Sequence, residues 1–232
     1  MNITERYARE TARDFAMRML KRNIASLELA PGTMLSENEL SAYMGLSRTP
    51  IREALIELAK IRIVEILPQR GSRIALIDWP LVEESRFVRL VLEKAVIKLA
   101  CAQAATLDFS IAEANVKLQQ FYIENDVPEK LTELDEGFHR EFFRLTNRLQ
   151  TFSLLEGMAL HSDRACNLTA GRIGETALVA DHEGILRAVR AGEGAKAAAL
   201  VEQHLARYRL DENDLRLHYP QYFAHVEQKA RL

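Results

Sequence analysis

A change of hydrophobic period near residue 61 is the feature that most constrains the fold of this 232-residue chain. Before it, apolar residues recur at the spacing of amphipathic helices. After it, 61–67 and 73–77 are rich in β-branched residues, which favour strands. The segment 68–72 between them holds a proline and a glycine, so the three segments predict a β-hairpin. Helices followed by such a hairpin indicate a winged helix-turn-helix.

Local signals divide the part before the hairpin into three helices. The first is an amphipathic stretch over about 4–26. Ser36, with a glutamate three residues later, forms a capping box that opens the second helix. Gly45 is suited to the left-handed conformation that ends it. Ser47 can cap the third helix, and Pro50 lies in the first turn of that helix, where a missing N–H costs little.

From residue 78 onward the sequence carries only helical patterns. Breaks at glycine, proline, asparagine and aspartate predict six helices, over 81–104, 109–125, 129–147, 150–170, 174–191 and 194–212. The fold class is therefore mainly α. We expect a winged helix-turn-helix domain over 1–77, an all-helical bundle over 78–212 and a C-terminal extension over 213–232.

Composition and charge are those of a soluble globular protein, with 48% hydrophobic and 28% charged residues. No apolar run approaches the roughly 20 residues that span a bilayer, and residues 1–20 lack the apolar core of a signal peptide. We therefore expect a cytoplasmic protein without a membrane partner. Residues 1–77 carry 12 Lys+Arg and 9 Asp+Glu, against 19 and 24 in the remainder. A mildly basic N-terminal part suits a DNA-binding domain.

Cationic and polar side chains gather at the start of the third helix and in the hairpin turn. Arg48 and Arg52 are four residues apart and so lie on one side of the helix, with Thr49 beside them. This end of a recognition helix enters the major groove, where arginine can pair with guanine. Ion pairs with Glu53 or Glu57 are the alternative. The predicted DNA contacts are Ser47, Arg48, Thr49, Arg52, Gln69, Arg70, Gly71 and Arg73.

Residues 31–76 resemble the DNA-binding domain of the GntR superfamily, most specifically in the stretch 47–55, Ser-Arg-Thr-Pro-Ile-Arg-Glu-Ala-Leu. The resemblance implies a homodimeric repressor or activator that binds a short palindrome in double-stranded DNA. It also implies DNA contacts from Arg48, Thr49, Arg52 and Gly71. After the recognition helix the chain reads Lys-Ile-Arg-Ile-Val where the family often has Glu-Gly-Leu-Val, which departs from the pattern at the turn into the first strand.

The later helices carry polar residues on stripes that should be buried. In the helix predicted over 129–147, Asp135 and His139 share the apolar face, and His182 and His204 lie on the apolar faces of two further helices. Burying such groups without partners costs several kcal/mol. A divalent cation would satisfy all four, and helical bundles build metal sites in this way. The alternative is that each histidine is a hydrogen-bonded core residue.

One carboxylate and three imidazoles suit zinc first, with nickel, manganese or iron as alternatives. Residues 81–210 also resemble the FCD (FadR C-terminal) ligand-binding domain of one GntR subfamily. Its metal-binding members carry an Asp-x-x-x-His helix and two histidines on later helices, which Asp135, His139, His182 and His204 match one for one. The resemblance implies that open positions on the metal accept the carboxylate or hydroxyl of a small organic acid.

Four further residues are candidate effector contacts. Arg89 matches an arginine of the family that points toward the cavity, and its guanidinium could bind a carboxylate through two hydrogen bonds. An ion pair with Glu93 is its alternative role. His161, Arg164 and Asn167 lie along one later helix and could line the same pocket.

Together these residues predict a ligand-responsive transcriptional regulator that is not an enzyme. By analogy with the family, an effector in the helical domain would bias the DNA-reading heads through the linker at 76–80. Two alternatives remain open at this stage. One is a metal-responsive regulator, and the other is a metal-dependent hydrolase with an appended helix-turn-helix, for which no general acid or base lies at a convincing spacing.

Overall fold

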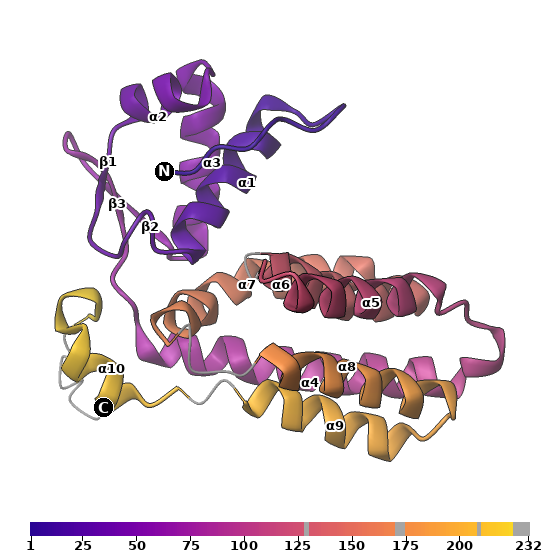
Figure 1. Cartoon of the computed structure of the whole chain (residues 1–232). Coiled ribbons are helices and arrows are strands. Elements are labelled where there is room, and N and C mark those ends of the chain that lie inside the picture. Colours follow the sequence, from indigo (N-terminus) through magenta and orange to yellow (C-terminus); the bar gives the residue numbers. More distant parts are fainter. Residues whose placement is uncertain (128–129, 170–174, 208–209, 225–232) are drawn as a thin grey trace. The chain divides into compact units, whose positions relative to one another are not determined.

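The computed structural model describes residues 1–127, 130–169, 175–207 and 210–224, and these form two compact units (Figure 1). The described residues of the first unit are 1–85, 157–169 and 210–224, and those of the second are 86–127, 130–156 and 175–207. The boundaries of these units differ from the domain boundaries expected at residues 77 and 212. The reason is that the helical segment 157–169 and the tail pack with the N-terminal elements. The predicted break at 171–174 and the chain beyond 224 lie outside the described residues.

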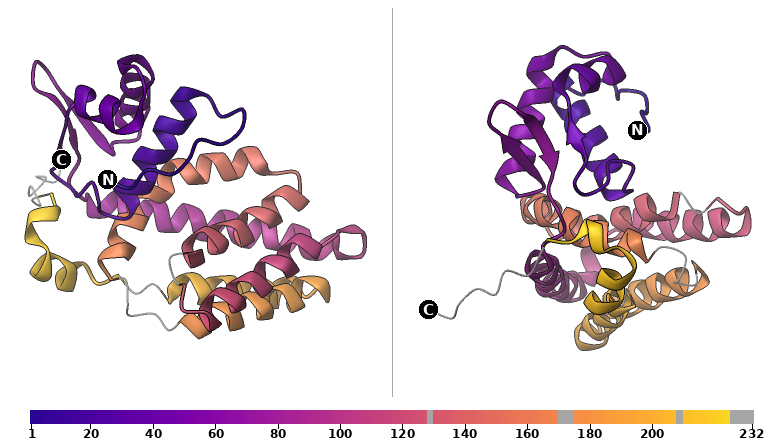
Figure 2. Two further views of the ribbon diagram at one scale, coloured as in Figure 1. Left: turned by 45° about the horizontal axis from the view of Figure 1, so that its top comes forward. Right: turned by 90° about the vertical axis from the view of Figure 1, so that its left-hand side faces the viewer.

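Three helices and a small sheet form the winged helix-turn-helix predicted for the N-terminal part. The helices are α1 (Ala12–Ala25), α2 (Glu37–Met44) and α3 (Arg48–Lys60). The antiparallel strands β1 (Met34–Leu35) and β2 (Val64–Leu67) both pair with β3 (Gly71–Ile74). Figure 2 shows these elements, in indigo and purple, from two further sides. The sequence predicted the hairpin of β2 and β3 but not the two-residue strand β1.

The helix ends confirm some of the local signals and correct others. The Ser36 hydroxyl accepts a hydrogen bond from the Glu39 amide at 3.4 Å, and Gly45 ends α2 with a φ of 63°. Ser47 occupies the position before α3 but makes no capping hydrogen bond with its side chain. The first helix begins later than the predicted residue 4, because Thr11 caps it by accepting from the Asp14 amide.

The core of the winged helix is formed by the apolar faces of α1 and α3 against the sheet. Its fully buried members include Met19 and Leu20 on α1, Ile51 and Leu58 on α3, and Ile74 on β3. Each such side chain stabilises the fold by about 1.5–3 kcal/mol. Leu160, far along the chain, belongs to the same core.

The C-terminal extension completes the first unit. It contains α10 (Glu212–His218) and the short 3₁₀ helix η3 (Pro220–Tyr222). After η3 the chain pairs in parallel with the linker, where the Ile77 amide donates to the Tyr222 carbonyl at 2.8 Å and the Ala224 amide donates to the Ile77 carbonyl at 3.0 Å. Trp79 packs near Phe223, with ring centroids 6.4 Å apart.

The second unit is the all-helical bundle predicted from the sequence. Its helices are α4 (Trp79–Ala102), α5 (Ser110–Glu124), α6 (Leu131–Leu145), α7 (Leu149–Leu168), α8 (Glu175–Arg190) and α9 (Gly194–Ala206), with a 3₁₀ turn η1 (Ala104–Thr106) after α4. The first turns of α4 and the part of α7 from Gly157 onward belong to the first unit. Helix α5 packs on α6 and α8, and α8 packs on α9.

Aromatic and aliphatic side chains fill the centre of this bundle. Phe138 and Phe142 on α6 meet Ile185 on α8 and Val201 on α9 in one buried cluster. The polar residues of the candidate metal centre lie on these same faces. Among the helices in the described ranges, none is both long and apolar enough to cross a membrane.

Candidate nucleic-acid interface and metal centre

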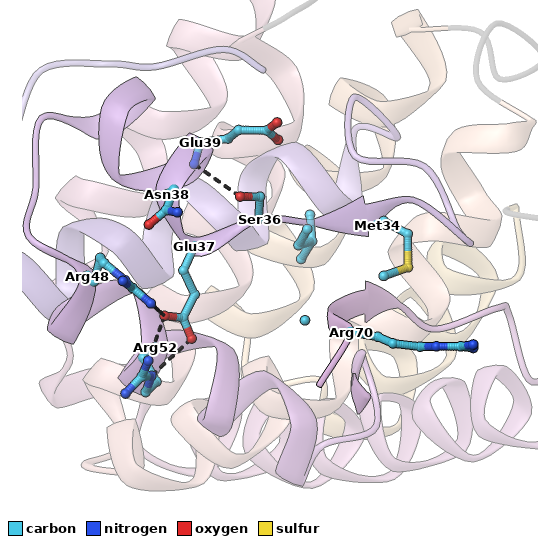
Figure 3. A pocket seen from close by; sticks show the side chains of 10 residues that line it. Met34, Ser36, Glu37, Asn38, Glu39, Arg48, Arg52 and Arg70 are labelled. Atoms are coloured by element: carbon cyan, nitrogen blue, oxygen red, sulfur yellow. Dashed lines mark hydrogen bonds and ion pairs between the residues drawn. The ribbon is translucent and has the colours of Figure 1, made fainter. Parts of the chain in front are cut away.

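Glu37, at the start of α2, holds both arginines that were predicted to read DNA (Figure 3). The Arg52 Nε and Nη2 atoms donate to the two Glu37 carboxylate oxygens at 3.0 and 2.9 Å, and Arg48 Nη2 lies 3.4 Å from Oε2. The hydrogen bonds from Arg52 keep the pKa of Glu37 below its ordinary value. The predicted alternative of ion pairs with Glu53 or Glu57 is therefore replaced by a pairing between α2 and α3.

These side chains line a concavity of about 480 Å³ between α2, α3 and the hairpin. Arg48 and Arg52 lie on one side of it, and Arg70 of the hairpin lies on another (Figure 3). Gly71, next to Arg70 in the hairpin, also lines it. Arg48 and Arg52 keep 60% and 58% of their side-chain surface exposed despite their bonds to Glu37. The structure thus brings four of the eight predicted DNA contacts, Arg48, Arg52, Arg70 and Gly71, to one accessible hollow, which Glu37 and Glu39 also line.

The hairpin residues have distinct local roles. Gly71 has a φ of +92°, and a Cβ there would lie 3.2 Å from the Leu35 carbonyl oxygen, so the position requires glycine irrespective of DNA. Gln69 has a φ of 60° and is exposed. Arg73 is paired across the sheet with Glu65 at 2.5 Å, so its charge is partly compensated within the protein.

The second unit brings Asp135 and His139 of α6 together with His182 of α8 and His204 of α9. One ligand atom from each of the four lies within 4.8 Å of every other. The Nε2 atoms of His182, His204 and His139 lie 3.3, 3.4 and 3.7 Å from the same Asp135 oxygen, Oδ1. The four residues that the sequence predicted as a metal site therefore converge on one point.

Burial leaves this cluster with unmet polar groups. The histidine side chains are at most 4% exposed, and that of Asp135 is 13% exposed. In the described part of the chain, neither Asp135 Oδ1 nor His182 Nε2 has a hydrogen-bond partner of good geometry. Buried atoms of this kind normally have a partner, so a cation bound among them would fit both the donor set and its deficit.

The pKa values of His182 and His204 lie on opposite sides of the ordinary histidine value. Burial lowers the pKa of His182 to about 4. Burial also opposes the charged form of His204, but the carboxylates of Asp135 and Asp181 outweigh it and raise that pKa to about 9. Although burial works against its ionisation, the imidazoles that face it, among them the protonated His204, hold the pKa of Asp135 well below its ordinary value. Without a cation, the cluster thus pairs the Asp135 carboxylate with a protonated His204.

The outer ring nitrogen of each histidine faces an acceptor that the sequence did not reveal as a partner. His139 Nδ1 lies 2.7 Å from Glu93 Oε2, and His204 Nδ1 lies 3.4 Å from Asp181 Oδ2. His182 Nδ1 lies 2.8 Å from the side-chain oxygen of Gln119. Among the described residues only the contact of His182 is a well-formed hydrogen bond, because His204 Nδ1 and Glu93 Oε2 lack one. An acceptor at Nδ1 favours an imidazole whose Nε2 can bind a metal. The Nε2 atoms of His139 and His204 lie 3.1 Å apart. The only sequence clue to any of these acceptors was the predicted pairing of Glu93 with Arg89.

Arg89 makes the predicted ion pair with Glu93 and also lies beside the candidate metal centre. Its Nε donates to Glu93 Oε1 at 2.7 Å, and its Nη2 lies 3.6 Å from Asp135 Oδ2. The side chain is 23% exposed. The guanidinium is therefore both tied to Glu93 and placed beside the carboxylate of the candidate metal centre.

His161, Arg164 and Asn167 belong to the first unit and are engaged there with main-chain carbonyls. His161 Nε2 lies 2.8 Å from the Ile61 oxygen, and Arg164 Nη1 donates to the Ala75 oxygen at 2.7 Å. Asn167 Nδ2 donates to the Ala25 oxygen at 2.7 Å. These bonds engage the three side chains with the main chain of the first unit, although Arg164 Nε has no partner among the described residues, and their role as effector contacts stays a prediction. Helical spacing put them on one face of α7 but could not identify what that face touches.

Comparison with known proteins assigns both parts of the chain. Residues 12–74 match the model described as "Bacterial regulatory proteins, gntR family", and residues 84–207 match the FCD domain. An "Uncharacterized HTH-type transcriptional regulator in unstable DNA locus" of Streptomyces ambofaciens is 34% identical over 93% of this chain and 91% of its own length. The "HTH-type transcriptional repressor RspR" of Escherichia coli K12 is 30% identical over 81% of this chain and 83% of its own.

Solved structures agree on the fold. Escherichia coli McbR/YncC superposes with a TM-score of 0.74 at 17% identity, over 92% of this chain and 99% of that one. A putative GntR regulator from Rhodococcus sp. RHA1 gives a TM-score of 0.68 at 20% identity, over 91% of this chain and 99% of that one. These relatives are regulators, which excludes the hydrolase alternative. The chain belongs to the GntR family and carries an FCD domain, and it is a DNA-binding transcriptional regulator.

Proposed function

We propose that this regulator responds to a small organic acid that binds beside a divalent cation in the helical unit. Asp135, His139, His182 and His204 would hold the cation. The observation that carries the proposal is the convergence of three buried Nε2 atoms on one carboxylate oxygen that has no well-formed hydrogen bond. Leaving such groups without a cation would cost several kcal/mol.

The donor set favours zinc, with nickel, manganese or iron as alternatives. Zinc accepts imidazole nitrogen and carboxylate oxygen and commonly takes four ligands, so an acid bound to zinc at this site would be a fifth ligand. Metals that accept five or six ligands would retain open positions after binding the same four groups. When bound, the cation supplies a positive centre that attracts a carboxylate or hydroxyl oxygen.

Arg89 is the residue of this chain best placed to select an acid. Its guanidinium lies beside Asp135 and keeps part of its surface exposed. A guanidinium can donate two parallel hydrogen bonds to a carboxylate. An acid bound here would therefore be held by the cation at one end and by Arg89 at the other, in competition with the bond from Arg89 to Glu93.

For the DNA-reading unit, we propose that two subunits present α3 to the two halves of a palindromic operator. Arg48, Thr49 and Arg52 would contact base edges, and Ser47, Gln69, Arg70, Gly71 and Arg73 would contact the backbone or the neighbouring groove. Arg48 and Arg52 would exchange their bonds to Glu37 for bonds to DNA. A homodimer is part of this proposal, since one half-site offers few contacts.

The metal site is tested by a double substitution, His182→Ala with His204→Ala. We expect the purified wild type to hold about one zinc or related ion per chain and the double variant to hold none by elemental analysis. His218→Ala is the matched control, because His218 is an exposed histidine on α10. Stoichiometric metal in the double variant would refute the site.

The effector is tested by titrating operator binding against the metal alone and against the metal with hydroxy acids, sugar acids or dicarboxylates. We expect a change in operator affinity only when an acid is present, and we expect Arg89→Ala to weaken the response to that acid. Release of DNA by metal alone would instead support the metal-responsive regulator.

A further inference from the structure

His182 differs from the other two cluster histidines in the partner of its outer ring nitrogen. Glu93 and Asp181, which face His139 and His204, are carboxylates. His182 instead faces Gln119, a fully buried, uncharged amide on α5. A buried amide that lacks hydrogen-bond partners destabilises the fold. The partners of the Gln119 side chain therefore constrain which way its oxygen and nitrogen point.

A second amide fixes the orientation of Gln119. Its side-chain nitrogen donates to the Asn115 side-chain oxygen at 2.6 Å, one helical turn away on α5. Its side-chain oxygen is then left to face His182 Nδ1 at 2.8 Å. With Asn115 oriented as in the structure, a reversed Gln119 would set its oxygen against that of Asn115, which is unfavourable.

This orientation determines where His182 holds its proton. An amide oxygen only accepts hydrogen bonds, so Nδ1 must be the donor. A neutral imidazole has one N–H, and Nε2 therefore presents a lone pair toward Asp135 and the centre of the cluster. His182 therefore donates to Gln119, and Gln119 donates to Asn115. This direction leaves Nε2 of His182 able to bind a cation.

Gly137 makes room for this chain on the neighbouring helix. It lies inside α6, between the two predicted ligands Asp135 and His139. A Cβ at this position would lie 3.1 Å from Asn115 Nδ2, closer than ordinary contact. Glycine inside a helix costs about 0.8–1.0 kcal/mol relative to alanine, so its presence between two ligands requires a local reason. The space taken by Asn115 supplies one.

We propose that Asn115, Gln119 and Gly137 act as positioning residues that fix the tautomer of His182 for metal binding. The proposal rests on the metal site proposed above. It predicts that the tautomer of His182 is set in the metal-free protein, before any cation binds. It also separates His182, which faces an amide, from His139 and His204, which face carboxylates.

The central test is Gln119→Leu, with Gln119→Glu as the rescue variant. Loss of the acceptor in Gln119→Leu should weaken zinc binding about 10–100-fold, as removal of such supporting hydrogen bonds does elsewhere. Gln119→Glu keeps an oxygen at Nδ1 and should stay within a few-fold of the wild type. Gln120→Leu is the control, because Gln120 is exposed on the same helix and bonds only to Glu124 among the described contacts. Zinc affinity is measured by competition with a chelating dye.

A second readout does not depend on the metal. Nitrogen-15 spectra of metal-free protein labelled in histidine show which ring nitrogen is protonated, and His182→Ala assigns the signal. We expect Nδ1–H in the wild type and in Gln120→Leu, and a mixture of tautomers in Gln119→Leu. Gly137→Ala should shift the same signal and weaken zinc binding several-fold. This variant and Asn115→Ala decide the question if Gln119→Leu fails to fold.

The outcomes separate the two proposals. Protonation of His182 at Nε2 in the wild type, or unchanged tautomer and zinc affinity in Gln119→Leu, would overturn the positioning role while leaving the metal site in place. Absence of zinc binding by the wild type, with the expected tautomer pattern across the variants, would instead refute the metal site and retain the hydrogen-bonded chain.

Discussion

The molecule contains two clusters of charged side chains that are built in opposite ways. In the first unit, Glu37 holds Arg48 and Arg52 at a surface where both arginines stay more than half exposed. In the second unit, Asp135 faces histidines that are almost completely buried. The first cluster is internally paired and open, and the second is closed and incompletely bonded.

This contrast indicates what each cluster can bind. Exposed ion pairs contribute little to stability and exchange partners readily, so they can be given up to a large anion such as DNA. A buried, underbonded cluster admits only a small partner and gains several kcal/mol when that partner arrives. Exposure, rather than residue type, therefore distinguishes a surface that reads a macromolecule from a site that holds an ion.

The largest expected effect is on folding of the metal-free protein. Asp135→Ala should lower the free energy of unfolding by about 3–5 kcal/mol at pH 6, because it leaves a buried, protonated His204 without its main partner. Glu37→Ala in the exposed cluster should cost less than about 1 kcal/mol. Urea denaturation in the presence of a chelator measures both. Equal losses in the two variants would remove the distinction between the clusters.

Zinc should stabilise the buried cluster by an amount set by its concentration. At 100 times its Kd, it should add about 2.7 kcal/mol to the free energy of unfolding. Thermal denaturation with zinc and with a chelator tests this. The double variant His182→Ala with His204→Ala should show no shift, and a shift of full size in that variant would place the ion elsewhere.

In the exposed cluster, Arg52→Ala should reduce operator affinity and leave stability intact. Loss of one paired contact to guanine costs about 1–3 kcal/mol, or roughly five- to 150-fold in affinity. Arg187→Ala is a matched control, since Arg187 is an exposed arginine on α8. Mobility shifts with operator DNA provide the measurement, and an unchanged affinity for Arg52→Ala would exclude α3 as the reading helix.

Zinc affinity should also depend on pH, since His204 must lose a proton to bind. Its pKa is about 9, so affinity should rise by up to tenfold per pH unit from about 6.5 to 9. In the metal-free protein the raised pKa stabilises the fold fully below about 6.5, and that contribution is lost as pH rises through 9. Calorimetry in buffers of different ionisation enthalpy should detect proton release on binding at pH 7. Affinity that is flat over this range would contradict a protonated His204.

The smallest effect concerns Glu37 itself. Glu37→Gln removes a negative charge from the hollow that faces DNA, so binding to DNA of unrelated sequence should strengthen several-fold at low salt. Stability should change by less than about 1 kcal/mol. The ratio of operator to unrelated-DNA affinity should therefore fall, and an unchanged ratio would show that Glu37 does not tune the two arginines.

Features encoded by neighbouring residues were predictable from the sequence. The cap at Ser36, the left-handed Gly45 and the hairpin after α3 follow from local chemistry, and the structure confirms them. The convergence of Asp135 and His139 with the later histidines also followed, because helical spacing places each on a buried face. Periodicity therefore predicted the fold class and the composition of the candidate metal centre.

Features that depend on tertiary pairing could not be read in this way. Strand β1 has two residues and exists only through its pairing with β3. In the sequence, Glu37 is one residue of the capping segment that begins α2. Its pairing with the arginines of α3 depends on how the two helices pack. Gln119 lies on a helix that offered no sign of which histidine it would face. Each of these features depends on which helices or strands pack together. Local patterns in a single sequence do not show this.

One buried face of α7 limits how separable the DNA-reading part of this protein is. Arg164, His161 and Asn167 satisfy the carbonyls at Ala75 and at the ends of α3 and α1, and Leu160 fills part of the same core. A fragment that ends at residue 77 would lose all four side chains, together with the tail that pairs with the linker. Chimeric regulators made by joining this reading head to a foreign sensor would therefore need residues 157–169 as well, because the head is continuous in space but not along the gene.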